Sequence, residues 1–165
     1  MVAKQGWQGR FFEDFEVGDV YKHQLGRTIT ETDNIWFTLL TMNTNPMHFD
    51  REYAKKSQFK RCIVNSGLTL AIVLGLSVRD LTQNAVANLG WDEVRLPNPL
   101  FDGDTLYAES EVLGKRESKS HPEAGIVEVK TRGYNQNGQT VMQYRRTFMV
   151  YKRAHSPYRV ESRKK

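Results

Sequence analysis

One short segment of the chain gathers side chains that could hold a water molecule and move a proton. The segment, Thr41-Met-Asn-Thr-Asn-Pro-Met-His-Phe-Asp50, places His48 five residues after Asn43, with Asn45 between them. A neutral imidazole accepts and returns a proton near neutral pH, whereas an asparagine amide orients water without titrating. We therefore take His48 as a candidate general base or acid, Asn43 as a candidate water-orienting group, and Asn45 as a candidate substrate-binding group.

A second segment, Ile63-Val-Asn-Ser-Gly-Leu68, follows 15 residues after His48 and opens an apolar stretch. Asn65 or Ser66 can cap the helix expected there, and the first N–H groups of a helix have no partner within the helix. At the positive end of the helix dipole such groups polarise a carbonyl oxygen, which makes Ser66 and Gly67 candidate donors. Each piece alone is weak, because a loop histidine is usually structural and Ser-Gly at a helix start is usually only a cap.

Helices are expected on both sides of the first segment. Thr30 and Asp33 have the spacing of a capping box, and the helix that follows has to end before Pro46. A short helix is expected over residues 50–56. The stretch 63–81 is apolar around nearly its whole circumference, which predicts a helix buried on nearly all sides. The apolar residues at helical spacing in the first of these helices are Ile35, Trp36, Leu39 and Leu40.

The second half of the chain changes to an alternating pattern of apolar and polar residues. This pattern predicts strands over 86–96, 104–116, 126–134 and 140–151. Asn135-Gln-Asn-Gly138 joins the last two as a hairpin turn, and strands that follow one another through tight turns form an antiparallel sheet. The prediction is an α+β single domain in which an antiparallel sheet is wrapped around a central buried helix.

Length and composition restrict the classes of protein that remain. The 165 residues are 39% hydrophobic and 26% charged, which is typical of one globular domain. No apolar run is long enough for a transmembrane helix, and the first residues lack the apolar core of a signal peptide, so we expect a cytoplasmic protein away from membranes. Cys62 is the one cysteine, which excludes an internal disulfide and a zinc site built on paired cysteines.

The net charge of +5 belongs to the end of the chain. Residues 151–165 hold six basic residues and one acidic residue, so the remainder carries 18 of each sign. Such tails are usually solvated, and no nucleic-acid recognition module accompanies this one, so nucleic acid is not expected as a partner. We expect an N-terminal arm over 1–10, the domain over 11–153 and a basic tail over 154–165.

Taken together, these segments resemble the MaoC-like (R)-specific enoyl-CoA hydratases and dehydratases, which have the hotdog fold. The signature of that family is Gly-Asp-x-Asn-Pro-x-His, an aspartate two residues later, and a segment like Ile-Val-His-Gly before the central helix. Asn45, Pro46, His48, Asp50 and Ile63-Val64 match it in place. The resemblance covers residues 10–153 and also includes Phe12-Glu-Asp-Phe-Glu-Val-Gly-Asp19, Arg27-Thr-Ile-Thr-Glu-Thr-Asp33 and Pro99-Leu-Phe-Asp-Gly-Asp104.

The resemblance implies addition or removal of water across the 2,3 double bond of an acyl-CoA. In the family an aspartate and a histidine activate the water, and a backbone N–H at the start of the central helix holds the thioester oxygen. Carried over, His48 is the base or acid, and Ser66, with Gly67 beside it, supplies the N–H. The family's aspartate falls at Asn43 and the histidine of Ile-Val-His-Gly at Asn65, and neither asparagine can act as a base.

Three interpretations of these departures stay open. His48 acts alone as the base while Asn43 and Asn65 position water; or the substrate itself carries a carboxylate that an aspartate would repel; or the chain is a non-catalytic hotdog subunit. The second is supported by Asn43-Thr-Asn-Pro and residues 88–97, which look similar to a subgroup acting on branched dicarboxylic acyl-CoAs such as mesaconyl-CoA or itaconyl-CoA. Arg61 or Arg95 could then pair with the substrate carboxylate.

The resemblance also bears on partners, cofactors and rival activities. The family closes the exposed edge of its sheet by pairing two protomers with the sites at the interface, so we expect a homodimer or a higher homo-oligomer. No metal or redox cofactor is implied, and the acyl-CoA itself is the substrate. A hotdog thioesterase is the rival enzyme, and it is disfavoured because residues 65–78 contain no Asp or Glu.

Overall fold

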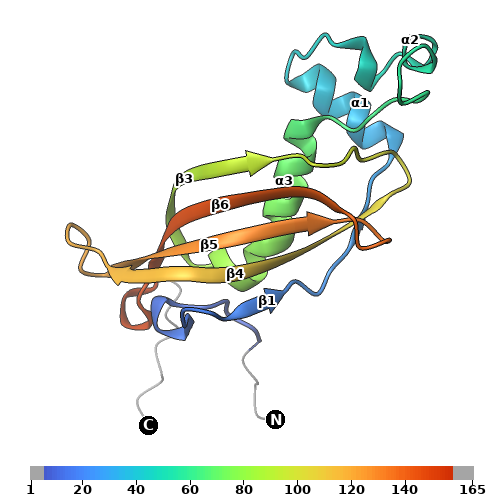
Figure 1. Cartoon of the computed structure of the whole chain (residues 1–165). Coiled ribbons are helices and arrows are strands. Elements are labelled where there is room, and N and C mark those ends of the chain that lie inside the picture. The colour runs from blue at the N-terminus through green and yellow to red at the C-terminus, as the bar shows by residue number, and fades with distance from the viewer. Residues whose placement is uncertain (1–5, 158–165) are drawn as a thin grey trace, which may run out of the picture.

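Six strands form an antiparallel sheet in a computed structural model that describes residues 6–157 (Figure 1). The helix α3 (Ser66–Ser77) packs against one face of the sheet, and the sheet curves around it. The predicted α+β architecture is therefore confirmed, as is the hairpin turn before Gly138. The sheet order is β1 (Val20–Lys22), β4 (Thr105–Glu117), β5 (Ala124–Tyr134), β6 (Thr140–Tyr151) and β3 (Ala85–Arg95), and β2 (Arg27–Thr28) pairs with β4 off this path.

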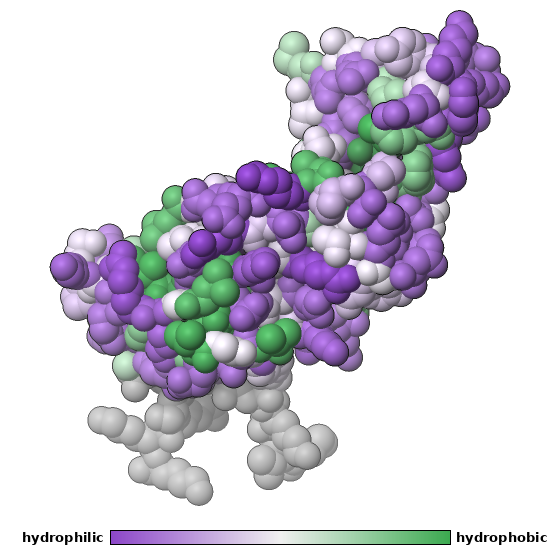
Figure 2. All heavy atoms as spheres, in the orientation of Figure 1, coloured by the Kyte–Doolittle hydropathy of each residue, from purple (hydrophilic) through white to green (hydrophobic). Residues whose placement is uncertain are grey.

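Two short helices stand at one end of the sheet as a separate lobe (Figures 1 and 2). These are α1 (Glu31–Leu40) and α2 (Arg51–Lys55), and the 3-10 turn η2 (Pro46–His48) lies between them in the chain. The predicted capping box is present: the Thr30 hydroxyl accepts a hydrogen bond from the Asp33 N–H, and the Asp33 carboxylate accepts one from the Thr30 N–H. In the described part of the chain, no helix has the length and apolar character needed to cross a membrane.

The helix α1 turns its polar side, not its apolar side, toward the rest of the chain. Asn34 and Thr38 are its buried residues, whereas Trp36 is 66% exposed and Leu40 is 76% exposed. The helical spacing of the apolar residues thus predicted the helix correctly. It did not predict that the buried face would be the polar one. An apolar stripe left in water is typical of a surface that meets another partner.

The helix α3 lies close to the sheet on one side and is open on the other. Val73 is fully buried, and Gly133 of β5 leaves the space it occupies, since a Cβ on Gly133 would lie 2.5 Å from Val73 Cγ2. The opposite side carries the exposed small residues Gly67, Ala71 and Gly75. The expectation of a helix buried on nearly all sides was therefore wrong for the single chain. The core between α3 and the sheet consists of Ile29, Val64, Leu68, Val73, Leu100, Leu106, Ala108, Val141, Met142 and Tyr144.

A second apolar cluster closes the far end of the sheet. Phe12 and Phe15, from the N-terminal segment, pack there on side chains of β4, β5 and β6 and on Leu81 after α3. Gly125 permits this contact, because a Cβ there would lie 2.1 Å from the Phe12 ring. The predicted arm over 1–10 is described only from residue 6, and the predicted tail over 154–165 only as far as residue 157.

A buried chain of polar side chains crosses the core at the C-terminal end of α3. His23 Nδ1 donates to Asp80 at 2.9 Å, and its Nε2 lies 3.0 Å from the Ser110 hydroxyl, which lies 2.8 Å from that of Thr131. The order of carboxylate, imidazole and hydroxyl is that of a hydrolase triad. Ser110, however, is only 1% exposed and cannot meet a substrate, so this row of hydrogen-bonded side chains is structural. Burial lowers the pKa of His23, and its hydrogen bond to Asp80 opposes this only in part.

We expect Gly133→Ala to destabilise the fold by about 1–3 kcal/mol, because the added methyl group overpacks the contact between α3 and β5. Urea unfolding measures the change through the transition midpoint. Gly114→Ala on β4 is the control, since its Cβ would meet only a flexible Glu128 oxygen at 4.0 Å. Equal midpoints for the two variants would contradict the close approach.

Stability is expected to fall as the pH drops below about 6.5, where His23 takes up a proton in the unfolded chain but not yet in the folded one. Its contribution is complete above the unfolded pKa and is lost as the pH falls toward the lower folded value. The slope is at most about 1.4 kcal/mol per pH unit for this one group. Urea titrations of the wild type and His23→Asn between pH 5.5 and 7.5 measure it. A slope that His23→Asn leaves unchanged would assign the pH dependence to other groups.

Candidate active site

The imidazole of His48 is held in one orientation at the end of η2. The residue is 9% exposed, and its Nδ1 lies 3.0 Å from the carbonyl oxygen of Ile63. A carbonyl oxygen only accepts hydrogen bonds, so Nδ1 carries the proton and Nε2 carries the lone pair. Asn45 caps the turn through its Oδ1, which accepts from the Met47 N–H at 3.1 Å, and Pro46 takes the first position. The local sequence thus fixes the orientation of this imidazole.

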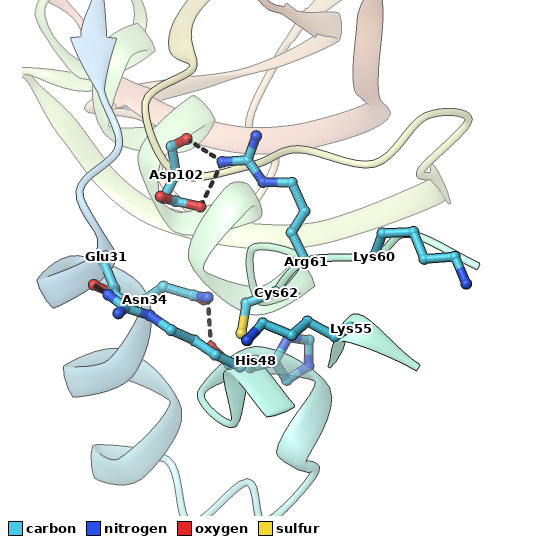
Figure 3. Close-up of a pocket in the computed structure, with 9 residues that line it drawn as sticks. Glu31, Asn34, His48, Lys55, Lys60, Arg61, Cys62 and Asp102 are labelled. Atoms are coloured by element: carbon cyan, nitrogen blue, oxygen red, sulfur yellow. Dashed lines mark hydrogen bonds and ion pairs between the residues drawn. The ribbon is translucent and has the colours of Figure 1, made fainter. Parts of the chain in front are cut away.

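Two cavities meet at His48. One, of about 430 Å³, is largely apolar and reaches Ser66 at the start of α3. The other, of about 250 Å³, is polar and lies toward α1 and α2 (Figure 3). The apolar cavity is also lined by Phe59, Ile63, Val64, Thr69, Leu96, Pro97, Asn98, Pro99, Leu100 and Val141, and the polar one by Glu31, Asn34, Arg51, Lys55, Lys60, Arg61, Cys62 and Asp102.

At the start of α3, Ser66 lines the apolar cavity and has an N–H that is unpaired among the described residues. Asn65 is the N-cap, and its Oδ1 accepts from the Gly67 N–H at 2.9 Å, so that donor is occupied. The Ser66 N–H has no acceptor among the residues that the structure describes. Gly67 instead contributes space, since a Cβ there would lie 3.1 Å from the Phe37 ring. Of the two predicted donors, Ser66 is the one available to a ligand.

Asn43 and Asn65 stand where the family that the chain resembles has an aspartate and a histidine. The side chains of both asparagines form hydrogen bonds within the protein. Asn43 Oδ1 accepts from the Asn45 N–H at 3.0 Å, which closes a tight turn, and neither residue lines the two cavities. Asn65 is 4% exposed, and its Nδ2 donates to the Thr38 hydroxyl at 3.2 Å. The structure thus brings His48, Asn65 and Ser66 together and leaves Asn43 and Asn45 in the supporting turn.

The two arginines proposed from the sequence lie in different places. Arg61 lines the polar cavity and pairs with Asp102, with Nη2 2.8 Å from Oδ1 (Figure 3). Arg95 is exposed at the end of β3, donates to the carbonyl of Val94, and lines neither cavity. Of the two, Arg61 alone is within reach of a ligand bound beside His48.

Residues that the sequence did not single out complete the site. Asn34 of α1 is 3% exposed and bonds to the backbone on both sides of the site. The one sign of Asn34 in the sequence is that it is polar and lies four positions before Thr38, on the same face of the helix. Arg51 and Lys55 of α2 line the polar cavity, and Arg51 pairs with Glu31 there.

Neither a metal nor a reactive thiol is suggested by the described residues. Across residues 6–157 no group of three or more His, Cys, Asp or Glu side chains is arranged to hold a metal ion. Burial raises the pKa of the Cys62 thiol, and nearby acidic side chains add to the effect. A thiol that stays protonated is a poor nucleophile, so Cys62 is not a candidate nucleophile.

Comparison with known proteins identifies relatives of this chain. The family described as "MaoC like domain" matches residues 14–134. A mesaconyl-CoA hydratase of Cereibacter sphaeroides is 39% identical over 145 residues, which are 88% of this chain and 42% of the relative. An (R)-specific enoyl-CoA hydratase of Aeromonas caviae is 30% identical over 76% of this chain and 88% of its own length. The chain therefore spans less than half of the first relative and most of the second.

Solved structures agree in fold. The MaoC domain protein dehydratase of Chloroflexus aurantiacus superposes with a TM-score of 0.86 at 35% identity, over 96% of this chain and 46% of that one. A Mycobacterium tuberculosis protein described as having a double hotdog fold superposes with a TM-score of 0.81 at 22% identity, over 92% of this chain and 46% of that one. The chain thus belongs to the MaoC-like dehydratases, and its antiparallel sheet around a central helix is the hotdog fold.

Proposed function

We propose that this protein is an acyl-CoA hydratase or dehydratase that acts on the 2,3 double bond of an enoyl thioester. The observation that carries the proposal is the presence of an oriented histidine and a free backbone donor at one apolar cavity. His48 presents a basic Nε2, and Ser66 presents the unpaired N–H at the start of α3. These are the two groups that water addition to a thioester-conjugated double bond requires.

In the hydration direction, His48 Nε2 takes a proton from water while the oxygen of that water bonds to C3. The electron pair of the double bond moves toward C2 and onto the thioester oxygen, which the Ser66 N–H stabilises as an enolate. The imidazolium then returns its proton to C2, so that H and OH are both added and His48 regains its neutral form. Dehydration is the reverse. One group performs both proton transfers, consistent with an asparagine at position 43.

The proposed substrate class is a small branched dicarboxylic acyl-CoA of the mesaconyl-CoA type. Relatives at 37–39% identity are a mesaconyl-CoA hydratase and a beta-methylmalyl-CoA dehydratase. No acidic residue lines the apolar cavity, so an anionic acyl group meets no like charge there. Arg61 at the adjoining cavity is the candidate partner for the second carboxylate, since Asp102 engages only one of its nitrogens.

The polar cavity is the proposed place for the free carboxylate of the acyl group. Arg51, Lys55, Lys60 and Arg61 give it four cationic side chains against the two acidic ones of Glu31 and Asp102. Both acidic groups already pair with arginines, and Lys55 pairs with Glu52, so among the described residues that line this cavity Lys60 carries the charge that remains for an anion. An acyl group that lies across both cavities would lie beside His48, which lines both of them.

A thioesterase is a weaker candidate on the same site. The hotdog thioesterases place a carboxylate at or just after the start of the central helix, whereas α3 (Ser66–Ser77) contains no Asp or Glu. A cytoplasmic location stays a prediction from the sequence.

We also infer that the protein acts as a homodimer. The strand β3 is an edge strand of 11 residues, and Leu89 and Trp91 on it are 49% and 39% exposed. The open side of α3 and the apolar stripe of α1 likewise lack cover within the chain. Two copies paired through β3 would form one continuous sheet, similar to the double hotdog fold of the Mycobacterium tuberculosis protein.

For catalysis, we expect His48→Ala to lower the rate of mesaconyl-CoA hydration by about 10²- to 10⁴-fold, because it removes the group that moves both protons. Product resolved by mass spectrometry measures turnover. His121→Ala, an exposed histidine away from the site, is the control. Efficient hydration of crotonyl-CoA with none of mesaconyl-CoA would refute the dicarboxylic substrate. A folded wild type without turnover of either would identify a non-catalytic subunit.

For assembly, we expect light scattering to give the mass of a dimer, and Leu89→Lys combined with Trp91→Lys to give a monomer. The substitutions place two positive charges on the exposed edge, where like charges of two copies would meet. Val17→Lys is the matched control, since Val17 is 61% exposed but lies in the N-terminal segment. A wild-type monomer at all concentrations, or a dimer that the double substitution leaves intact, would exclude this interface.

A further inference from the structure

Asn34 joins the three segments that carry the chemistry of the site. Its Nδ2 donates to the carbonyl of His48 at 2.8 Å and to that of Ile63 at 3.1 Å, and its Oδ1 accepts from the Asn65 N–H at 2.8 Å. The side chain is buried, and both of its donor hydrogens and its oxygen are engaged. The orientation of the amide is unambiguous, because the opposite one would place its oxygen against two carbonyls.

The carbonyl of Ile63 receives two donors, one from Asn34 and one from the His48 imidazole. Asn34 therefore holds two groups in place: the Ile63 carbonyl, which orients the His48 ring, and the backbone of His48 itself. The same amide holds the backbone of Asn65, the residue before the free Ser66 N–H. The base and the donor for the enolate are thus tied to one side chain, which also lines the polar cavity.

We infer that Asn34 is a positioning residue for the hydration reaction: it holds the Nδ1–H tautomer of His48 and the spacing between His48 Nε2 and the Ser66 N–H. This inference rests on the proposed function. No other residue type supplies two donors and one acceptor at this reach: aspartate has no N–H, serine has one hydroxyl, and glutamine is a methylene longer. Groups that orient a catalytic histidine typically change activity about 10- to 100-fold when removed.

The structure offers a matched control for the loss of a buried amide. Asn84, 6% exposed, donates through Nδ2 to the carbonyls of Gln8 and Arg10 at 2.8 and 3.1 Å, far from His48 in the fold. Asn34→Ala and Asn84→Ala therefore remove comparable bonds to backbone carbonyls. A difference in kcat or tautomer between the two variants therefore reflects the location of Asn34 beside His48, and not the general loss of stability that follows the removal of a buried amide.

Two readouts test the inference. NMR of the imidazole nitrogens, assigned with His48→Ala, is expected to show the Nδ1–H tautomer in the wild type and in Asn84→Ala, and a shift toward Nε2–H in Asn34→Ala. The kcat of hydration is expected to fall about 10- to 100-fold in Asn34→Ala, with KM changed less than threefold, and to stay at the wild-type value in Asn84→Ala. Asn34→Asp, which keeps the size and the acceptor for Asn65, is expected to behave as Asn34→Ala at pH 8.

The outcomes separate this inference from the proposed function. An unchanged tautomer and kcat in Asn34→Ala, or an equal loss of kcat in Asn84→Ala, would overturn the positioning role. If the wild type hydrates no acyl-CoA, the proposed function fails, and the tautomer comparison still decides whether Asn34 orients His48. If Asn34→Ala does not fold, the tautomer and kcat of Asn34→Asp decide in its place.

Discussion

The start of α3 is fixed by side-chain hydrogen bonds from another helix, and the rest of the site depends on that attachment. The contact between Val73 and Gly133 sets how closely α3 approaches the sheet. Packing alone does not fix the first turn, where backbone groups have to find partners or remain unpaired. Asn65 satisfies one N–H, Asn34 holds the backbone of Asn65, and the Ser66 N–H is left over. A free donor in a defined place is the result.

The hydrogen-bond partners that hold His48 are neutral over the whole physiological pH range. Asn34, Thr38, Asn65 and the carbonyl of Ile63 exchange hydrogen bonds without a formal charge. A neutral network avoids the desolvation penalty of a buried ion pair, and it holds its geometry whichever protonation state His48 takes during turnover. The same neutrality suits a substrate that brings its own negative charge. Asn65 belongs to this neutral network, whereas Asn43 closes the turn that leads to η2.

Local patterns in the sequence predicted the elements well, because their causes are local. Thr30 and Asp33 form their capping box within one turn, and Asn135 to Gly138 form their hairpin within four residues. The buried face of α1 was not predictable in this way, since it depends on Asn34 meeting residues 14 and 29 positions later in the chain. The same holds for Asn43, whose side chain is spent on a turn that only coordinates reveal. Family resemblance pointed to His48, Ser66 and Gly67 as candidates, and only the geometry of the helix cap shows that the Gly67 N–H is occupied while that of Ser66, among the described residues, is not.

The uncovered sides of the chain have a thermodynamic consequence. The strand β3 presents unpaired backbone groups along an edge of 11 residues, and Trp36 and Leu40 of α1 stand in water. Whatever covers these surfaces binds the folded chain and not the unfolded one, so by mass action it raises the free energy of unfolding with its own concentration. For the proposed homodimer, the melting temperature is then a property of the protein concentration as well as of the sequence. Dilution alone would lower it, without any change in a covalent bond or in pH.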